Sequence, residues 1–324
     1  MRGFWDYDHS PYVHEKIAHG QRISRRHCLE SSNRIAYWEK DYAALSIGNL
    51  SQQEISALSL KLSAQGLSPA TINKVMLVCS TAMAWAKRHG VLERDPFEGT
   101  MRFSERHKKR GILAPEEVTA LFAKGRWPNS LTRVASLLSC TTGLRAGECR
   151  AVQIQDIHNG YLTVWAWSDI DGRKPPKNGE NRVVPLLPQV VEELNRLVAE
   201  NPFGQSPENF VFYSAFPERP IRPEPLIKGL EAALESIGID NNTRLERHID
   251  FHSWRHYYAA TMATYVTSRK LRVVTGHKSQ SVFDGYADHA QAADVQEVKN
   301  AESAAFRHIF DAEMDMETSL EVCS

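Results

Sequence analysis

Apolar residues recur at helical spacing in two runs within the first third of the chain, Ile55–Leu62 and Ile72–Trp85. Neighbours three or four positions apart share one face of a helix, so each run predicts a helix with one buried side. Ser51 and the glutamate three positions later match a capping box before the first run, and Ser68, followed by proline, matches the start of the second. The pattern predicts a small all-helical domain over residues 33–103.

The pattern becomes mixed after residue 111. Tyr161–Trp167 alternates apolar and polar residues as a half-buried strand does, and a polar turn at 169–179 separates it from a second expected strand at 181–186. These two strands predict a β-hairpin. Helices are expected at residues 114–124, 129–140, 188–201, 224–237, 252–266, 268–275 and 279–286. Residues 112–290 therefore predict a second domain, mainly α with a small β-sheet.

Polar segments surround these two domains. Residues 104–111 are rich in Lys and Arg and lie between two apolar patterns, which predicts a basic interdomain linker. Residues 1–32 hold aromatic, His and Arg residues without a clear period, and we expect an N-terminal extension with a short helix near Tyr12–His19. Residues 291–324 are expected to form a helix, apolar on one side, and an acidic tail.

The composition is that of an ordinary globular protein, with 42% hydrophobic and 24% charged residues among 324. No apolar run approaches the ~18 residues that span a bilayer. The first ten residues are aromatic and charged, unlike a secretory signal. The five cysteines are scattered without the spacing of zinc ligands. We therefore expect a cytoplasmic protein with reduced thiols and no membrane partner.

The formal net charge is zero, but the charge is unevenly distributed. Residues 1–110 carry 17 Lys and Arg against 11 Asp and Glu, residues 111–293 carry 20 of each kind, and residues 294–324 carry 2 against 8. A basic front part is compatible with a surface that faces DNA. The acidic tail would then be kept off the DNA or docked on another protein.

A set of basic, imidazole and phenol side chains is spread over the second domain. It comprises Arg145 in Thr-Gly-Leu-Arg-Ala-Gly-Glu, Lys177 near the hairpin turn, His252 and Arg255 in His-x-x-Arg, His277 after a glycine, and Tyr286 nine residues later. Arginine offers a donor fork that matches phosphate oxygens. Histidine can donate to a phosphate or move a proton near neutral pH, and a tyrosine hydroxyl can attack phosphorus. The set fits chemistry at a phosphodiester.

Taken singly, each of these residues also has a structural interpretation. Arg145 and Lys177 fit solvated surface positions, His252 fits a helix cap, His277 fits a hydrogen-bonded core histidine, and Tyr286 fits a packing residue. Three other tyrosines nearby are expected to pack on the helix that begins at residue 252: Tyr257, Tyr258 and Tyr265.

In their order and spacing the motifs resemble the catalytic domain of the tyrosine recombinases, the phage integrase family. The similarity covers about residues 112–290, and the helical segment at 33–103 resembles the core-binding DNA-binding domain of that family. Arg145 and Arg255 match the paired arginines that clamp the scissile phosphate. Lys177, five residues before Arg182, matches the hairpin lysine suited to protonate the departing 5′ oxygen, and Tyr286 stands at the position of the nucleophile.

The remaining motif positions follow the same resemblance. His252 begins the His-x-x-Arg motif, and His277 stands where the family has His or Trp. Glu148 falls where the family often has an acidic residue that supports the site. Trp254 departs from the more usual Leu, a change that does not touch the chemistry.

The resemblance implies the integrase of a mobile element, which recombines DNA at specific sites through a 3′-phosphotyrosyl intermediate and a Holliday junction. Its expected partners are double-stranded DNA, further copies of itself as a tetramer on two sites, and accessory DNA-bending proteins. No cofactor or metal is expected, because cationic groups would neutralise the phosphate. Residues 1–32 are too short for a full arm-binding domain and would be a remnant of, or linker from, such a region.

Three alternatives stay open at this point. A type IB topoisomerase shares the nucleophile chemistry but relaxes DNA as a monomer. A catalytically silent DNA-binding regulator would form no covalent adduct. A metal-dependent nuclease is the least favoured, because two-metal sites need clustered carboxylates and the motifs supply none.

Overall fold

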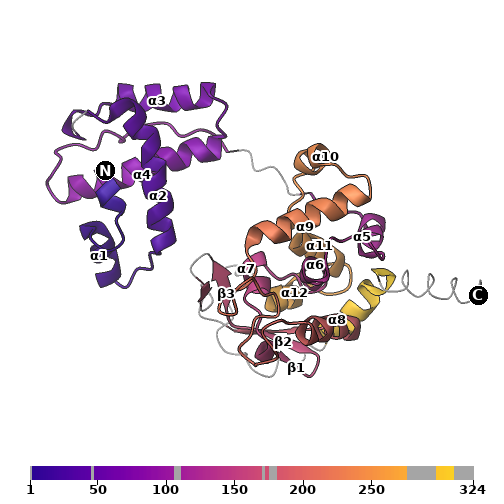
Figure 1. Cartoon of the computed structure of the whole chain (residues 1–324). Coiled ribbons are helices and arrows are strands. Elements are labelled where there is room, and N and C mark those ends of the chain that lie inside the picture. The colour runs from indigo at the N-terminus through magenta and orange to yellow at the C-terminus, as the bar shows by residue number, and fades with distance from the viewer. Residues whose placement is uncertain are drawn as a thin grey trace, which may run out of the picture. The chain divides into compact units, whose positions relative to one another are not determined.

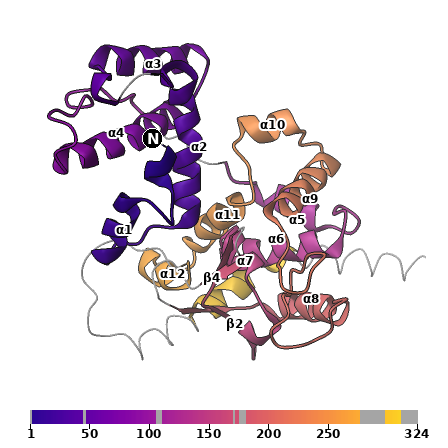
Figure 2. The ribbon, with the colours of Figure 1, turned by 60° about the vertical axis from the view of Figure 1, so that its left-hand side comes forward.

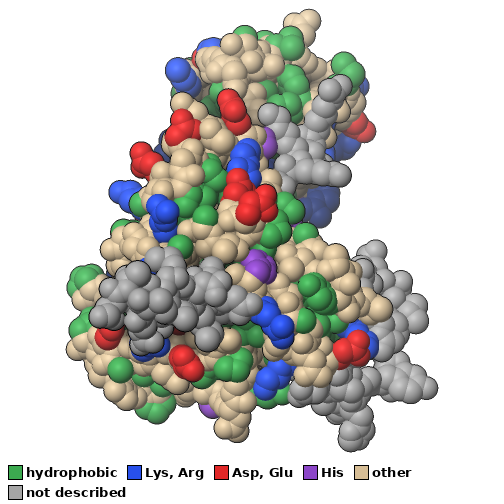
Figure 3. Space-filling model, turned by 90° about the vertical axis from the view of Figure 1, so that its right-hand side faces the viewer, with side chains coloured by type: hydrophobic (Ala, Val, Ile, Leu, Met, Phe, Trp, Pro, Cys, Tyr) green, Lys and Arg blue, Asp and Glu red, His purple; other side chains and the backbone are tan. Residues whose placement is uncertain are grey.

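The computed structural model describes residues 2–44, 47–105, 111–169, 172–174, 181–275 and 297–309. The chain divides into two compact units, unit 1 at Met1–Lys108 and unit 2 at Lys109–Ser324 (Figure 1). Within the described ranges, no helix is both long and apolar enough to cross a membrane. On the face that Figure 3 shows, basic and acidic side chains are interspersed.

The described part of unit 1 contains helices and no strands. Its elements are η1 (Arg2–Trp5), α1 (Pro11–Ala18), α2 (Arg25–Tyr42), η2 (Ile47–Asn49), α3 (Gln52–Ala64) and α4 (Pro69–Arg88). The expected capping box is present at the start of α3, where the Glu54 carboxylate accepts from the Ser51 N–H at 2.6 Å. Figure 1 shows α2 crossing α4, and the core of the unit lies where these helices meet. The helical character expected for this part of the chain is confirmed.

Residues 1–32, expected as an extension, are part of the folded core of unit 1. Trp5 and Tyr12 are buried, and the Trp5 indole donates to the carbonyl of Val78 at 3.3 Å. Helix α2 also runs across the expected boundary at residue 32. The physical reason is that aromatic side chains of this size bury large apolar areas once a partner helix is available. An irregular segment without a period gives no sign of that partner in the sequence.

Unit 2 is built around helix α6. Its helices are α5 (Pro115–Phe122), α6 (Ser130–Thr142), α7 (Ala146–Arg150), η3 (Ile154–Asp156), α8 (Pro188–Ala199), α9 (Pro223–Ser236), α10 (Asn241–Glu246), α11 (Ser253–Met262) and α12 (Ser268–Thr275). Helix α6 contacts α7, α8, α9 and α11, and Figures 1 and 2 show it between α9 and the strands. It is therefore buried along most of its length in spite of several Ser and Thr residues. One of them, Thr141, satisfies its hydroxyl by donating to the carbonyl of Leu137 at 2.9 Å.

Two small antiparallel sheets lie in unit 2. The first has the order β1-β2-β5, and the second pairs β3 with β4. The strands are β1 (Ile157–His158), β2 (Tyr161–Val164), β3 (Trp167–Asp169), β4 (Gly172–Lys174) and β5 (Arg182–Pro185). The expected hairpin is confirmed by the β2–β5 pairing, in which Val164 stands opposite Arg182. The turn expected at residues 169–179 instead begins with the β3–β4 ribbon, whose strands are too short and polar to show in the sequence.

A C-terminal helix packs on unit 2. Residues 297–305 and 307–309 are helical, and the side chains that face inward are Val298, Glu302, Ala305, Phe306 and Ile309. The Phe306 ring stacks on that of Tyr258, with centroids 5.9 Å apart. A helix in this region, apolar on one side, was expected from the sequence, but the buried glutamate was not. Unit 2 as a whole confirms the expected fold, mainly α with a small β-sheet.

Candidate active site

Arg145 is placed by the sharp end of helix α6. Gly143 closes that helix in the left-handed conformation, with φ of 67°, and the chain then enters α7 with Arg145 at its N-cap. A Cβ atom on residue 143 would lie 2.6 Å from Cδ1 of Tyr258, so only glycine fits both the backbone and the space. The turn leaves the Arg145 side chain 43% exposed. This arginine is therefore held at its backbone and open to solvent at its guanidinium.

Glu148 joins Arg145 to Arg182. The Glu148 carboxylate accepts from the Arg145 backbone N–H at 2.9 Å and from Arg145 Nη1 at 3.0 Å. It also accepts from both terminal nitrogens of Arg182, at 3.0 and 2.7 Å. Burial raises the pKa of Glu148, but the hydrogen bonds and charge of Arg182, with those of Arg145, lower it overall. The carboxylate is therefore ionised at neutral pH and holds two guanidiniums in place.

Arg255 lies behind this pair and is only 2% exposed. It projects from α11, and its terminal nitrogens donate to the carbonyls of Gly143 at 2.8 Å and Thr275 at 2.6 Å. Burial, and then the positive charges of Arg145 and Arg182, lower the pKa of Arg255 to about 10. The group is still cationic at neutral pH. A buried cation close to other cations is typical of a site that binds an anion.

Together these groups form what we call the arginine cluster: Arg145, Arg182 and Arg255 around Glu148. Three positive charges and one negative charge leave an excess of two. The cluster is assembled from the α6–α7 turn, β5 and α11, with the end of α12 supplying a carbonyl. Arg145 is the partly exposed member of the cluster, and its guanidinium fits a phosphate group because a guanidinium fork can donate to two oxygens.

The six residues expected at the site differ in how far the structure places them. Arg145 and Arg255 come together in the arginine cluster. His252 is the N-cap of α11, one turn before Arg255, and its ring lies 5.1 Å from that of His256. The other three, Lys177, His277 and Tyr286, lie outside the described residues. Of the nearby tyrosines, Tyr257 and Tyr258 are buried as expected, whereas Tyr265 is 50% exposed.

Arg182 belongs to the arginine cluster, although the sequence analysis assigned it no role. Its Nε also donates to the carbonyl of Val274 at 2.7 Å, so it ties β5 to α12. One feature of the sequence could have indicated this role. Arg182 lies at the start of an expected strand, and apolar residues follow it in Arg182-Val-Val-Pro. Such an arginine has to find an acidic partner once the strand is buried.

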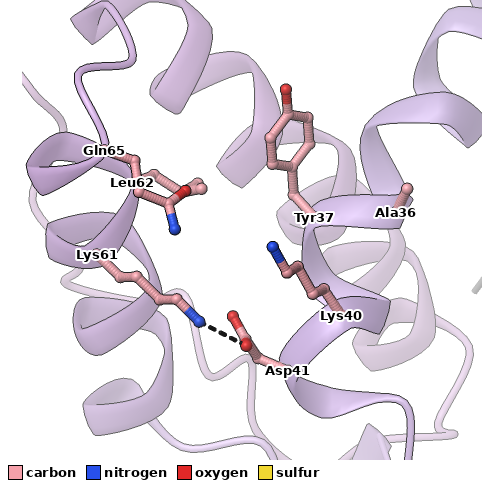
Figure 4. Close-up of a pocket in the computed structure, with 7 residues that line it drawn as sticks. All are labelled: Ala36, Tyr37, Lys40, Asp41, Lys61, Leu62 and Gln65. Atoms are coloured by element: carbon pink, nitrogen blue, oxygen red, sulfur yellow. Dashed lines mark hydrogen bonds and ion pairs between the residues drawn. The ribbon is translucent and has the colours of Figure 1, made fainter.

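A small hollow of about 200 Å³ lies in unit 1. It is lined by Ala36, Tyr37, Lys40, Asp41, Lys61, Leu62 and Gln65. Figure 4 shows Lys61 reaching from α3 to Asp41 on α2, an ion pair of 2.6 Å. With one lysine thus paired, the hollow offers less positive charge than the arginine cluster. In the described ranges no group of three His, Cys, Asp or Glu side chains could hold a metal ion.

Comparison with known proteins gives matches of three kinds: a protein family, a relative with a similar sequence, and solved structures. The phage integrase family matches residues 112–293. The ICEBs1 integrase of Bacillus subtilis (strain 168) is 28% identical over 118 residues, which cover 36% of this chain and 32% of that protein. The matched region is thus about a third of the length of that relative.

Solved structures of two integrases share the fold. The Tn1549 transposon integrase in complex with a circular intermediate DNA has a TM-score of 0.67 at 17% identity, over 88% of this chain and 96% of that one. A lambda integrase tetramer bound to a Holliday junction has a TM-score of 0.62 at 18% identity, over 84% and 77% of the two chains. The family match spans more than half of the sequence and includes every residue of the arginine cluster. The chain belongs to the phage integrase family.

Proposed function

We propose that this chain is a site-specific DNA recombinase, the integrase of a mobile element, which cuts and rejoins strands through a covalent 3′-phosphotyrosyl intermediate. The observation that carries the proposal is the arginine cluster. It carries two excess positive charges in unit 2, and solvent reaches it through Arg145, whose side chain is 43% exposed. A phosphodiester brings one negative charge and two non-bridging oxygens, which match the donor forks of arginine.

In the proposed cleavage step, the hydroxyl of Tyr286 attacks phosphorus and the bond from phosphorus to the 5′ oxygen breaks. A tyrosine has an ordinary pKa of about 10, so its proton has to be accepted as it attacks, and we assign this task to the histidines, His252 and His277. Lys177 gives a proton to the departing 5′ oxygen. Arg145 and Arg255 stabilise the charge that gathers on the non-bridging oxygens.

The products of that step are a 3′-phosphotyrosine and a free 5′ hydroxyl. Rejoining is the reverse reaction with the 5′ hydroxyl of another strand. Because the phosphodiester energy stays in the protein–DNA ester, religation consumes no ATP. The cationic side chains perform the charge stabilisation that bound metal ions perform in two-metal nucleases.

Unit 1 is proposed to be the core-binding domain that helps to hold the DNA. Helix α4 exposes Lys74, Leu77, Ala84 and Arg88, which share one face, with a basic residue at each end. A helix of 20 residues is about 30 Å long and fits the major groove. Small and apolar residues in the middle can contact base edges while the terminal cations contact phosphates.

Recombination between two sites is proposed to need several copies of the chain. We infer a tetramer on two DNA sites that exchanges strands in pairs through a Holliday junction, in the cytoplasm where the substrate DNA is. The lambda integrase tetramer on a Holliday junction, which shares this fold, supports that arrangement. Accessory DNA-bending proteins would help to bring the two sites together.

The test uses a nicked suicide duplex that carries the joined ends of the mobile element encoding this chain. Three proteins are incubated with it in EDTA: wild type, Tyr286→Phe, and the control Tyr265→Phe, which changes a half-exposed tyrosine of unit 2. We expect a covalent protein–DNA adduct with wild type and with the control, and none with Tyr286→Phe. Denaturing gels resolve the adduct.

Each other outcome points to a different function. An adduct that persists in Tyr286→Phe would move the nucleophile elsewhere. Specific DNA binding without any adduct would support a silent regulator. Relaxation of plasmids that lack the site would support a topoisomerase, and loss of cleavage in EDTA would support a metal-dependent nuclease.

A further inference from the structure

The β3–β4 ribbon of unit 2 is held by a network of side-chain contacts around Arg173. The Arg173 guanidinium lies 3.7 Å from the centre of the Trp165 ring and pairs with the Asp156 carboxylate at 2.7 Å. It also contacts the side-chain oxygen of Gln153. The side chains of Arg173 and Asp156 are 14% and 4% exposed, so the pair is shielded from water. A shielded pair with several contacts holds its strand firmly.

Asp156 is the hub of this network. Its carboxylate also accepts from the Trp165 indole at 2.6 Å and from the Gln153 backbone N–H at 2.8 Å. The carboxylate therefore orients both the aromatic ring under the guanidinium and the guanidinium itself. The guanidinium lies over the indole ring in a cation–π contact, and lysine cannot reproduce its planar donor fork.

The same ribbon is fixed to α7, the helix that carries Arg145 at its N-cap and Glu148 in its first turn. A Cβ atom on Gly147 would lie 3.1 Å from the Ser168 carbonyl, so β3 lies directly on the backbone of α7. Arg150 donates from Nη1 to that same carbonyl at 3.2 Å. Ser168 stands opposite Arg173 in the ribbon. The network around Arg173 therefore holds the ribbon through β4, and helix α7 holds the same ribbon through β3.

The residue proposed as the proton donor, Lys177, follows Arg173 by four positions in the sequence. Lys177 therefore follows strand β4 closely in the chain. The contacts of Gly147 and Arg150 with the Ser168 carbonyl fix the position of the ribbon relative to α7. We infer that Arg173 is a positioning residue for protonation of the leaving 5′ oxygen. It acts by holding β4 in register with the helix of the arginine cluster. This inference rests on the proposed recombinase function and on the role assigned there to Lys177.

The test separates loss of the proton donor from general damage to the site. It compares cleavage of an ordinary suicide duplex with cleavage of one whose scissile 5′ oxygen is replaced by sulfur. A thiol has a pKa of about 8.5, so the departing thiolate needs no proton, whereas an alkoxide does. A variant that mispositions only the donor is slow on oxygen and normal on sulfur. A variant with a damaged clamp or fold is slow on both.

We expect Arg173→Leu to cleave the oxygen substrate at least about tenfold more slowly than wild type, and the sulfur substrate within about threefold of it. Lys177→Ala should show the same selective loss, and Trp165→Leu, which removes the ring beneath the guanidinium, a smaller one. The matched control is Arg219→Leu, which removes an exposed arginine that lies 6.0 Å from the Phe216 ring in the same unit. It should leave both rates unchanged.

Equal loss on the two substrates in Arg173→Leu, or no loss on either, would overturn the positioning role. Lack of sulfur rescue in Lys177→Ala would overturn it as well, because the donor would then lie elsewhere. Failure of the wild-type protein to form an adduct with either substrate is a different result, and it would count against the proposed recombinase function itself.

Discussion

Arg182 and Glu148 form a two-point ion pair, with N–O distances of 3.0 and 2.7 Å, that joins strand β5 to helix α7. The two side chains are 11% and 10% exposed. Because Glu148 also holds the backbone and guanidinium of Arg145, one carboxylate sets the spacing between the exposed Arg145 and the shielded Arg182. The pair thus links the fold of unit 2 to the geometry of its candidate site.

Glu148→Gln should disrupt both the fold and the site. An amide presents only one acceptor oxygen and no charge, so Arg182 would be left largely unpaired in a shielded position. Removing one partner of a buried pair typically costs about 3 kcal/mol of unfolding free energy. We expect a clearly lowered Tm and a cleavage rate reduced by at least about tenfold, equivalent to about 1.4 kcal/mol. Calorimetry and the suicide-duplex assay measure these two quantities.

The matched control is Glu193→Gln. Glu193 pairs with Arg133 at 3.1 Å in the same unit, with side-chain exposures of 17% and 20%. Its loss should lower the Tm modestly and leave the cleavage rate unchanged. Equal effects of the two substitutions on cleavage would contradict the special role of Glu148.

Gly143→Ala should damage the site through the backbone. The new methyl group would press on Tyr258 at 2.6 Å, in a left-handed conformation that disfavours any side chain. The Gly143 carbonyl accepts from Arg255, so a shift there moves the clamp. We expect a loss of about 3 kcal/mol in unfolding free energy and strongly reduced cleavage.

A second glycine separates the two causes. Gly204 has a similar φ, 84°, but has no atom within 4 Å of an added Cβ. Gly204→Ala should therefore show only the backbone cost, about 1 kcal/mol, with normal cleavage. If both alanine variants lose the same stability and activity, the clash between residue 143 and Tyr258 does not affect the Gly143 carbonyl that accepts from Arg255.

Inorganic phosphate should stabilise unit 2 by binding at the arginine cluster. The lowered pKa of Arg255, about 10, reflects its burial beside Arg145 and Arg182, and an added anion relieves that repulsion. A ligand that binds only the folded state raises its stability with concentration. We expect a rise in Tm with phosphate that exceeds the effect of chloride at equal ionic strength. The excess should disappear in Arg145→Ala, whose guanidinium is the exposed member of the cluster, and persist in Arg196→Ala, which removes a surface arginine.

Periodic segments explain how much of the fold could be read from the sequence. Three local patterns predicted elements that the structure contains. They are the capping box at Ser51 before α3, the apolar spacing of Ile72–Trp85 in α4, and the alternation in Tyr161–Trp167, where β2 lies. The order of motifs likewise brought Arg145 and Arg255 into one expected site. These signals depend on neighbours within one or two turns, which a single sequence contains.

What the sequence could not show depends on distant partners. Trp5 packs in a core formed by helices that come later in the chain, and Arg182 finds Glu148 across 34 positions. Glu302 is a third case, because its position between Val298 and Ala305 places it on the buried stripe of its helix. The spacing was visible, but a glutamate is normally exposed, so only its tertiary partner, Tyr258, explains its burial.

Glu302 should make the stability of unit 2 depend on pH in an unusual direction. Burial raises the pKa of Glu302 well above its ordinary value of 4.5, with the Tyr258 hydroxyl and the Lys299 charge opposing the shift. The folded state therefore keeps a proton that the unfolded state releases above about pH 4.5. Stability is fully present below that pH and is lost as pH rises toward the folded-state pKa. The slope is at most about 1.4 kcal/mol per pH unit.

Glu302→Gln isolates this contribution. The amide is neutral at every pH, and its oxygen can still accept from the Tyr258 hydroxyl, which lies 2.7 Å from the native carboxyl. We expect the difference in Tm between the variant and wild type to grow in favour of the variant from pH 5 to pH 8, as measured by thermal unfolding. Glu297→Gln changes an exposed glutamate on the same helix, paired with Lys270, and should leave the pH dependence as it is. A constant difference between Glu302→Gln and wild type over this range would mean that Glu302 is already ionised in the folded protein.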